Sequence, residues 1–256
     1  MHGPSQTGTP LKTVVRTFEI VEFIKDREGA RVLEVSEHFD LPNSTVHSYL
    51  ASLHELGYLV KDGDEYHVGL QFLHVGGHAA TRHRAYQMAR PKVKELAMET
   101  NERAQFIVEE FGYGIYLHME TGDNAVETDV RIGKMASLHT TSAGKAILAH
   151  LPEEQVMRIV DRYGLSKRTE NTITDPDALL EELETIRDRG YAYNDGERIT
   201  GMRAVGVPIT DVEDDVVGAL SVSGPAHRMK GNWYEKEIPD LLLGTANELE
   251  LNLTYQ

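Results

Sequence analysis

The sequence predicts an α+β protein with an N-terminal winged helix-turn-helix, a helical connector, and a C-terminal domain built on a mostly antiparallel sheet. Three observations lead to this fold class. Apolar residues recur at helical spacing in three short segments before residue 57. A β-hairpin pattern follows them. From residue 104 onward, short apolar runs bounded by glycines alternate with amphipathic helices. With 256 residues, the chain is long enough for two domains.

The first domain is expected over residues 11–70, after a Gly-, Pro-, Ser- and Thr-rich tail (residues 1–10) that is expected to be disordered. Its helices are predicted at about 11–27, 32–39 and 43–56. Asp40-Leu41-Pro42 breaks the chain before the third helix, and Gly57 ends that helix. Asp62-Gly63 between two apolar runs predicts the hairpin. Three helices and a hairpin in this order indicate a winged helix-turn-helix.

Residues 71–256 are expected to hold the connector and the second domain. The connector helix is predicted to reach about Arg84, and another helix covers 85–100. Strands are predicted at 104–109, 114–120, 124–130, 205–210 and 216–223, and further helices at 141–150, 152–163, 176–189 and 234–253. The helix at 141–150 is expected to open on Ser142, and Asn43 or Ser44 is expected to cap the third helix.

Charge is the unusual feature of the composition. The chain has 41 Asp and Glu against 26 Lys and Arg, a formal net charge of −15. Surface carboxylates keep a protein soluble at very high salt, which favours a halophilic host, with an ordinary acidic cytoplasmic protein as the alternative. The absence of cysteine excludes disulfides and thiolate sites. No apolar run long enough to span a membrane and no signal peptide pattern occur, so we expect a cytoplasmic protein without a membrane partner.

DNA readout is expected from the start of the third helix, where short hydrogen-bonding side chains fit a major groove. These residues are Asn43, Ser44, Thr45, His47 and Ser48. Helix capping is the alternative for the first three, and the two roles are compatible. Phosphate contacts are expected from the cations Lys12, Arg16, Arg31 and Lys61.

The charge of this domain argues against ordinary DNA binding. Its first 76 residues hold six basic and eleven acidic side chains, a net of 6 − 11 = −5. In molar salt, however, the counterion-release contribution largely vanishes, so base contacts, shape and hydration would have to carry the affinity.

Ser142-Ala143-Gly144-Lys145 matches the Ser-x-x-Lys pattern of acyl enzymes, but the companion motifs Ser-Asp-Asn and Lys-Thr-Gly are absent. We therefore expect no catalytic residue here. A helix start whose free N–H groups face a cavity, a natural anion site, is the favoured interpretation, and a plain tight turn is the alternative.

Other candidate sites are weaker. His74 and His78 have the spacing of a zinc pair, but no third ligand stands at a suggestive position, so exposed histidines are favoured and no metal is expected. No phosphate-binding glycine loop occurs, and no cofactor is expected. Ser221 and Ser223 lie at a predicted strand end, where they either face a ligand pocket or pack as small residues in the sheet.

Taken together, these segments resemble the IclR-type family of transcriptional regulators. The resemblance rests on the winged helix-turn-helix and on the segments His139 to Ala149, Arg189 to Glu197, and Val205 to Pro225. It covers nearly the whole chain after the tail. It implies a GAF-like effector-binding domain, dimers formed through the DNA-binding half, and often tetramers formed through the other half. It also implies double-stranded operator DNA and a small-molecule effector as partners, the latter frequently an aromatic, short organic or sugar acid.

The resemblance also implies the residues of the effector pocket. Carried over to this sequence, they are Met135, Leu138, Ser142, Ala143, Asn194, Ala204, Ser221 and Ser223. Asn194 and Ala204 stand where one branch of the family has an acidic residue and a cysteine, so the ligand of that branch does not transfer. The third helix also lacks an arginine that many relatives have, which leaves the operator sequence open.

We therefore expect a ligand-responsive regulator, a repressor or activator of metabolic and especially catabolic genes. Effector binding would change the connector and with it the separation of two recognition helices in a dimer, which operator half-sites hold at about 34 Å or multiples of it. A coupling of about 1–3 kcal/mol is typical of such switches. The alternatives are a small-molecule enzyme or sensor that uses the C-terminal half, with the winged helix as a protein-interaction module, and an interaction scaffold.

Overall fold

The computed structural model describes residues 10–126 and 130–255, which form two compact units. The first unit ends at Arg82 and the second begins at His83. Helices and antiparallel sheets are combined in both units, so the predicted α+β class is confirmed. The tail predicted to be disordered lies outside the described residues up to position 9. Among the residues that the structure describes, no helix is both long and apolar enough to cross a membrane.

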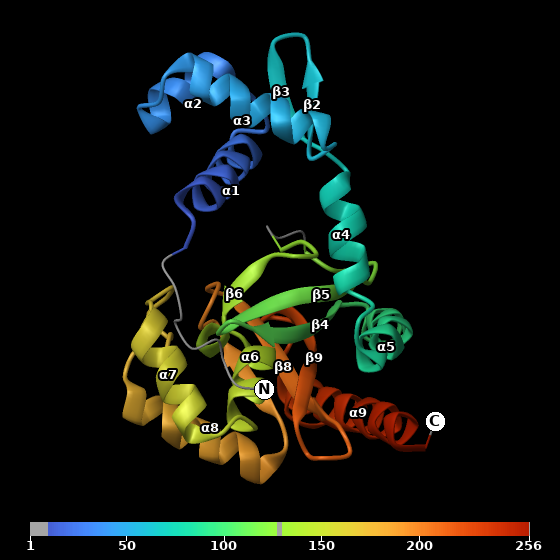
Figure 1. Cartoon of the computed structure of the whole chain (residues 1–256). Helices are drawn as coiled ribbons and strands as arrows, with labels where there is room; N and C mark the ends of the chain where they lie inside the picture. Colours follow the sequence, from blue (N-terminus) through green and yellow to red (C-terminus); the bar gives the residue numbers. More distant parts are fainter. Residues whose placement is uncertain (1–9, 127–129, 256) are drawn as a thin grey trace. The chain divides into compact units, whose positions relative to one another are not determined.

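The first unit is a small helical bundle with a three-stranded sheet (Figure 1). Its elements are α1 (Lys12–Asp26), β1 (Ala30–Arg31), α2 (Val32–Phe39), α3 (Asn43–Glu55), β2 (Leu59–Asp62), β3 (Glu65–Val68) and α4 (Gln71–Ala79). The strands are antiparallel in the order β1-β3-β2, so β2 and β3 form the predicted hairpin. The helical apolar stripes meet in one core made of Ile20, Val21, Ile24, Ala30, Val35, Val46, Leu50, Leu53, Leu59 and Tyr66.

The start of α3 corrects one prediction. Pro42, rather than Asn43 or Ser44, is the N-cap residue, and no side chain caps the helix. The Pro42 carbonyl oxygen accepts the N–H of Thr45 at 2.9 Å. Asn43, Ser44 and Thr45 are therefore helical residues with exposed side chains that capping does not use.

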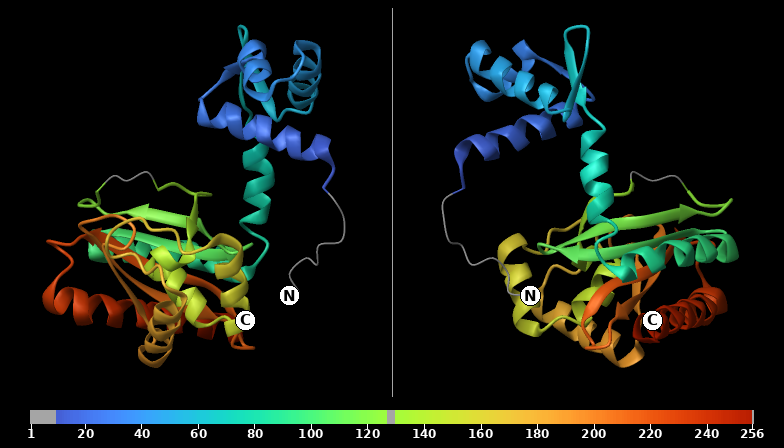
Figure 2. Two further views of the ribbon diagram at one scale, coloured as in Figure 1. Left: turned by 90° about the vertical axis from the view of Figure 1, so that its left-hand side faces the viewer. Right: turned by 45° about the vertical axis from the view of Figure 1, so that its right-hand side comes forward.

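The second unit is a six-stranded antiparallel sheet covered by helices on both faces (Figures 1 and 2). Its helices are α5 (Arg84–Thr100), α6 (Ser142–Ala149), α7 (Glu153–Tyr163), α8 (Pro176–Arg189) and α9 (Ile238–Tyr255). Its strands are β4 (Arg103–Glu110), β5 (Tyr113–Thr121), β6 (Met135–Ser137), β7 (Ala192–Asp195), β8 (Met202–Thr210) and β9 (Val216–Pro225), in the order β6-β5-β4-β9-β8-β7.

Each face of this sheet has its own core. Helices α5 and α9 cover one face, with Ala89, Val93, Leu96, Phe106, Val205, Val207, Leu220, Val222, Ile238, Leu242 and Leu249. Helices α6, α7 and α8 cover the other face, with Ile107, Ala143, Ala146, Ile147, Val156, Leu179, Leu183, Ile186, Ala192 and Ala219. Phe106 and Ile107, neighbours on β4, point to opposite faces, as the two-residue period of a strand requires.

Several element boundaries differ from the prediction. The expected strand at 124–130 is wrong over the described residues 124–126 and 130, where Ala125 N–H bonds to the Gly122 carbonyl in a turn; residues 127–129 lie outside the described part. The short strands β1 and β6 were missed because two or three residues carry no recognisable period. Strand β7 was missed because buried Asn194 interrupts its apolar pattern. The last helix begins at Ile238, after a π-helical turn at Trp233–Glu237.

The start of α6 rests directly on strand β8. A Cβ added to Gly206 of β8 would lie 2.6 Å from the backbone nitrogen of Ala143, so only glycine allows this approach. Thr141 caps the helix by accepting the Gly144 N–H at 3.0 Å, and Ser142 is its first residue, as predicted. This contact brings the N-terminus of α6 to the edge of a cavity.

Candidate functional site

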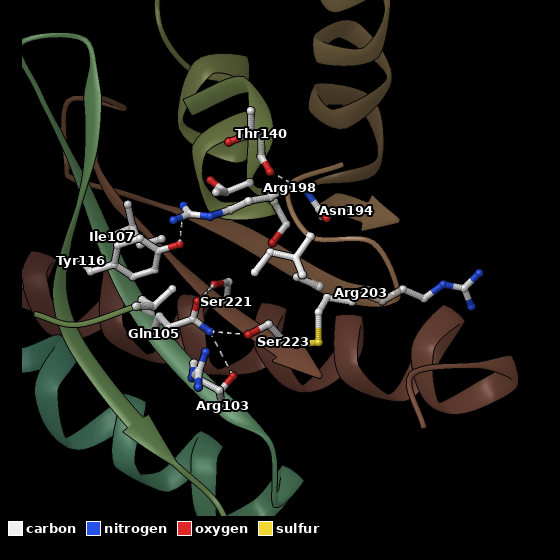
Figure 3. Close-up of a pocket in the computed structure, with 16 residues that line it drawn as sticks. Arg103, Gln105, Ile107, Tyr116, Thr140, Asn194, Arg198, Arg203, Ser221 and Ser223 are labelled. Carbon is white, nitrogen blue, oxygen red and sulfur yellow. Dashed lines mark hydrogen bonds between the residues drawn. The ribbon is translucent and has the colours of Figure 1, made fainter. Parts of the chain in front are cut away.

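A cavity of about 60 Å³ lies in the second unit between the start of α6, the sheet, and the β7–β8 turn (Figure 3). Strands β4, β5, β8 and β9, the segment before α6 and the turn all contribute to it. It is lined by Arg103, Gln105, Ile107, Tyr116, Val130, Thr140, Thr141, Ser142, Asn194, Arg198, Ile199, Met202, Arg203, Ala204, Ser221 and Ser223.

The structure brings five of the eight residues expected in an effector pocket to this cavity. They are Ser142, Asn194, Ala204, Ser221 and Ser223. The other three are not among the lining residues. Leu138 and Ala143 are buried in the apolar core between α6 and the sheet, and Met135 lies on the edge strand β6 with 51% of its surface exposed.

Asn194 is buried and already hydrogen-bonded. Its Nδ2 donates to the Thr140 carbonyl oxygen at 2.7 Å, and its Oδ1 accepts the Glu197 N–H at 3.3 Å. A carboxylate at this position could not donate the first of these bonds. Asn194 therefore ties the end of β7 and the following turn to the segment before α6.

Ser221 and Ser223 are connected through a residue that the sequence interpretation missed. Gln105 of β4 donates from Nε2 to Ser223 Oγ at 2.8 Å, and Ser221 Oγ lies 3.5 Å from its Oε1 (Figure 3). Because β4 and β9 pair with Gln105 opposite Ser221, these polar groups share the cavity floor.

Three arginines on the cavity wall were also missed. Arg103 follows the β4 alternation with Gln105 and Ile107, so the two-residue period could have placed it here. Arg203 makes a two-bond contact with Asp195, at 2.7 and 2.9 Å. Arg198, in the β7–β8 turn, donates from Nη1 to the Tyr116 hydroxyl at 3.1 Å. No carboxylate occurs among the described residues that line the cavity.

Lys145 of the Ser-x-x-Lys pattern is buried behind the cavity. Its Nζ lies 2.8 Å from Glu197 Oε1 and 3.2 Å from Glu182 Oε1, so it serves as the cation of a buried ion pair. Burial raises the pKa of Glu197 and outweighs the opposing effect of Lys145. An ion-paired ammonium is no base for Ser142, which removes the physical support for nucleophilic catalysis.

The candidate DNA-reading surface is the exposed start of α3 in the first unit. Asn43, Ser44, Thr45, His47 and Ser48 are all exposed, and Ser48 Oγ bonds to the Ser44 carbonyl oxygen at 3.0 Å within the helix. Their side chains are oriented outward because Val46 and Leu50 fill the core.

The candidate phosphate-binding cations differ in their partners. Arg31 Nε lies 3.3 Å from Asp64 Oδ2 on the hairpin, and Arg31 Nη2 lies 3.2 Å from Glu65 Oε1. Arg16 pairs with Glu19 at 3.2 Å. Lys61 lies 5.3 Å from the centre of the Tyr66 ring, and Lys12 is exposed on the first turn of α1.

No group of three or more potential metal ligands occurs among residues 10–126 and 130–255. His74 and His78 lie on α4 with exposed side chains.

Comparison with known proteins decides the family. Residues 77–251 match the model of the bacterial transcriptional regulator IclR C-terminal domain, and residues 13–63 match that of the IclR helix-turn-helix domain. The chain belongs to the IclR family. It is therefore a transcriptional regulator with a helix-turn-helix and a C-terminal domain, and the enzyme and scaffold alternatives are not favoured.

Relatives of known name match most of the length of this IclR-family chain. The probable HTH-type transcriptional regulator ArcR of Halobacterium salinarum is 34% identical, over 97% of both chains. Its source agrees with the salt-rich host expected from the acidic composition. The transcriptional repressor IclR of Escherichia coli is 29% identical, over 86% of this chain and 82% of its own.

Solved structures share the fold. The Thermotoga maritima IclR structure superposes with a TM-score of 0.79 and is 31% identical, covering 95% of this chain and 99% of its own. An IclR homologue from Microbacterium hydrocarbonoxydans, solved in complex with 4-hydroxybenzoate, has a TM-score of 0.80 and 24% identity, covering 94% of this chain and 97% of its own.

Proposed function

We propose that this IclR-family regulator binds operator DNA through the start of α3 and that an organic acid in the second-unit cavity changes that binding. Residues 11–70 would form the DNA-binding domain, and residues 71–256 the connector and GAF-like effector-binding domain. A homodimer or tetramer in the cytoplasm would present paired recognition helices to two operator half-sites.

The observation that carries the effector proposal is the charge of the cavity wall. In a chain with a net charge of −15, the described wall residues include three arginines and no carboxylate; Asp195 neutralises Arg203, but Arg198 has no carboxylate within ion-pair distance among the described residues. Hydroxyl and amide groups, among them Ser142, Ser221 and Gln105, supply further hydrogen bonds. A cationic and hydrogen-bonding wall favours a small anion, and the volume of about 60 Å³ favours a short one. The 4-hydroxybenzoate in the Microbacterium homologue is itself a carboxylate and belongs among the probes.

DNA binding by this acidic unit would depend on individual side chains rather than on net charge. Five short polar residues at the exposed start of α3 are not used for capping, so they are available for base edges. Lys12, Arg16, Arg31 and Lys61 would contact phosphates, at reduced benefit in high salt.

The test begins with the DNA. The protein is crosslinked in its native host at the host's own salinity, and the DNA that co-purifies is sequenced. We expect a few sharp peaks over a palindromic element, whereas uniform background under several carbon sources would contradict DNA readout. The recovered element, labelled with a fluorophore, then serves for anisotropy measurements with and without short organic acids. An operator affinity unchanged by acids that do bind would contradict the coupling.

Substitution of the reading helix gives the second test. His47→Ala with Ser48→Ala removes two exposed groups at the start of α3, and we expect operator affinity to fall about tenfold to a hundredfold, since good base contacts contribute about 1–3 kcal/mol. Thr185→Ala on α8 is the matched control, because Thr185 Oγ1 bonds to the carbonyl four residues earlier, as Ser48 does. Unchanged affinity in the double variant would contradict the assignment of α3.

A further inference from the structure

Arg198 lacks the carboxylate partner that two other arginines of the second unit, Arg203 and Arg228, have. It lines the cavity and is half-buried, yet among the described residues no carboxylate lies within ion-pair distance of it. By contrast, Arg203 on the same wall is neutralised by Asp195, and Arg228 by the buried Glu102 at 2.6 Å. The chain has 41 acidic residues that could have paired with this arginine. A half-buried arginine without a carboxylate partner therefore indicates a binding site for an anion that is not part of the chain.

The guanidinium of Arg198 is held in one place by an aromatic side chain. It lies 5.6 Å from the centre of the Tyr116 ring, and its Nη1 donates to the Tyr116 hydroxyl at 3.1 Å. Tyr116 is only 3% exposed. Figure 3 shows the Arg198 side chain extending from its turn toward Tyr116 across the cavity. A guanidinium has five N–H groups in a planar fork, and the bond to Tyr116 uses one of them. The fork can therefore still take a carboxylate with two parallel bonds.

The turn that carries Arg198 is anchored through the residue before it. The Glu197 side chain is ion-paired with Lys145, and its carbonyl oxygen accepts from Thr172 Oγ1 at 2.6 Å. Its N–H donates to Asn194. Lys145 lies on α6, the helix whose first residue, Ser142, also lines the cavity. The buried Lys145–Glu197 pair thus connects the turn bearing Arg198 to α6, the helix whose start lines the cavity.

We propose that Arg198 binds the carboxylate of the effector and makes the cavity selective for an acid over its neutral analogue, and that Lys145 and Glu197 are positioning residues for it. The proposal deepens the function proposed above and rests on it. Gln105, Ser221 and Ser223 on the sheet would hydrogen-bond a second polar group of the same ligand, which points to a short hydroxy- or oxo-carboxylic acid. Because Arg198 is half-buried, salt screens its attraction for the carboxylate less than it would at an exposed site.

The test compares acids with their amides on the full-length protein in concentrated KCl. Calorimetric titration uses glycolate, lactate and 4-hydroxybenzoate, each beside its uncharged amide. We expect the wild type to bind at least one acid about tenfold or more tightly than the amide, because a charge-assisted two-point contact is lost in the amide. Arg198→Gln is expected to lose that preference and to keep the affinity for the amide. Arg198→Lys is expected to recover part of the preference for the acid. Arg168 is an exposed arginine elsewhere in the same unit, and Arg168→Gln is expected to behave as the wild type.

Two results would contradict the proposal in distinguishable ways. An acid preference that survives Arg198→Gln would overturn the assignment of Arg198 and leave the anionic effector standing. Failure of every acid to bind the wild type would overturn the anionic effector and, with it, the assignment.

Glu197→Gln separates positioning from simple structural support. If Glu197 is a positioning residue, Glu197→Gln is expected to lower the affinity for the acid several-fold. The affinity for the amide is expected to stay unchanged, because Glu197 acts only through the placement of Arg198. An equal loss of affinity for acid and amide would show that it merely supports the cavity.

Discussion

The two units of this regulator differ in how deeply their ion pairs are buried. In the first unit, ion pairs are exposed: Arg31 lies between Asp64 and Glu65 on the hairpin, with about half of its side chain accessible. The second unit has exposed pairs as well, such as Lys167 with Glu170, but among the described residues it alone also has internal ones. The Lys145 and Glu197 side chains are 2% and 11% exposed, and Glu102, paired with Arg228, is 4% exposed.

An acidic side chain therefore has a different effect when it is exposed, as in the first unit, than when it is buried, as in the second. Under the proposed function, exposed carboxylates of the first unit would compete with DNA phosphates for the nearby cations, and exposed pairs add little to stability. Buried carboxylates of the second unit hold secondary structure elements together, because a charge removed from water needs its partner. In the second unit, the absence of a carboxylate beside Arg198 among the described residues is therefore informative, whereas the same absence on the surface would not be.

The largest expected effect tests the buried pair. Lys145→Met leaves Glu197 buried without its cation and is expected to destabilise the second unit by about 3–5 kcal/mol. Lys25→Met is the control in the first unit, where an exposed pair with Glu22 and Asp26 is expected to contribute about 0–1 kcal/mol. Denaturant unfolding of the full chain measures both. Equal losses in the two variants would remove the contrast between the units.

A smaller effect tests the competition at the hairpin. Asp64→Asn with Glu65→Gln frees Arg31, and we expect affinity for duplex DNA to rise by up to about tenfold at moderate salt, with the slope of log K against log salt steeper by about 0.9. The matched control, Glu153→Gln with Glu154→Gln on α7 of the second unit, changes the net charge equally. If both double variants raise the affinity alike, net charge rather than the local pairing governs DNA binding.

The smallest effect tests a buried neutral side chain beside the cavity. Burial lowers the pKa of His139 and outweighs the hydrogen bond between its Nε2 and the Ser166 carbonyl. The unfolded chain therefore binds this proton more readily than the folded one, so stability is lost as the pH falls through the ordinary histidine value of about 6.5. The His139→Gln variant is expected not to lose this part of its stability as the pH falls.

Urea unfolding between about pH 5.5 and 7.5 measures the effect as the difference between the His139→Gln variant and the wild type. The exposed His78→Gln is expected to follow the wild type. Parallel curves for the wild type and His139→Gln would show that His139 titrates alike in both states.

Most of the fold could be predicted because its signals are local. The apolar spacing of α1 to α3 and Asp62-Gly63 place the winged helix-turn-helix within a few residues, and the long strands β4, β5, β8 and β9 were found. The errors were the missed short strands, the strand expected at 124–130, and the cap of α3. Pro42 begins that helix without a side-chain acceptor, a role that sequence statistics assign to Asn or Ser.

The candidate site was predicted in part. Resemblance to relatives identified Ser142, Asn194, Ala204, Ser221 and Ser223, which do line the cavity. It also nominated Met135, Leu138 and Ala143, which are not among the lining residues: Leu138 and Ala143 pack in the core between α6 and the sheet, and Met135 lies on the edge strand β6.

The sequence by itself determined the α+β class, the family and the polar character of the start of α3, since each depends on residues close together in the chain. Only the tertiary structure decided which charges face the cavity. The pairing of β4 with β9 joins Gln105 to Ser221, and the turn after β7 brings Arg198 to Tyr116. These contacts join residues 116 and 82 positions apart, so no local pattern encodes them. Whether an arginine pairs with a carboxylate of the chain or is left without one depends on the packing of the whole unit.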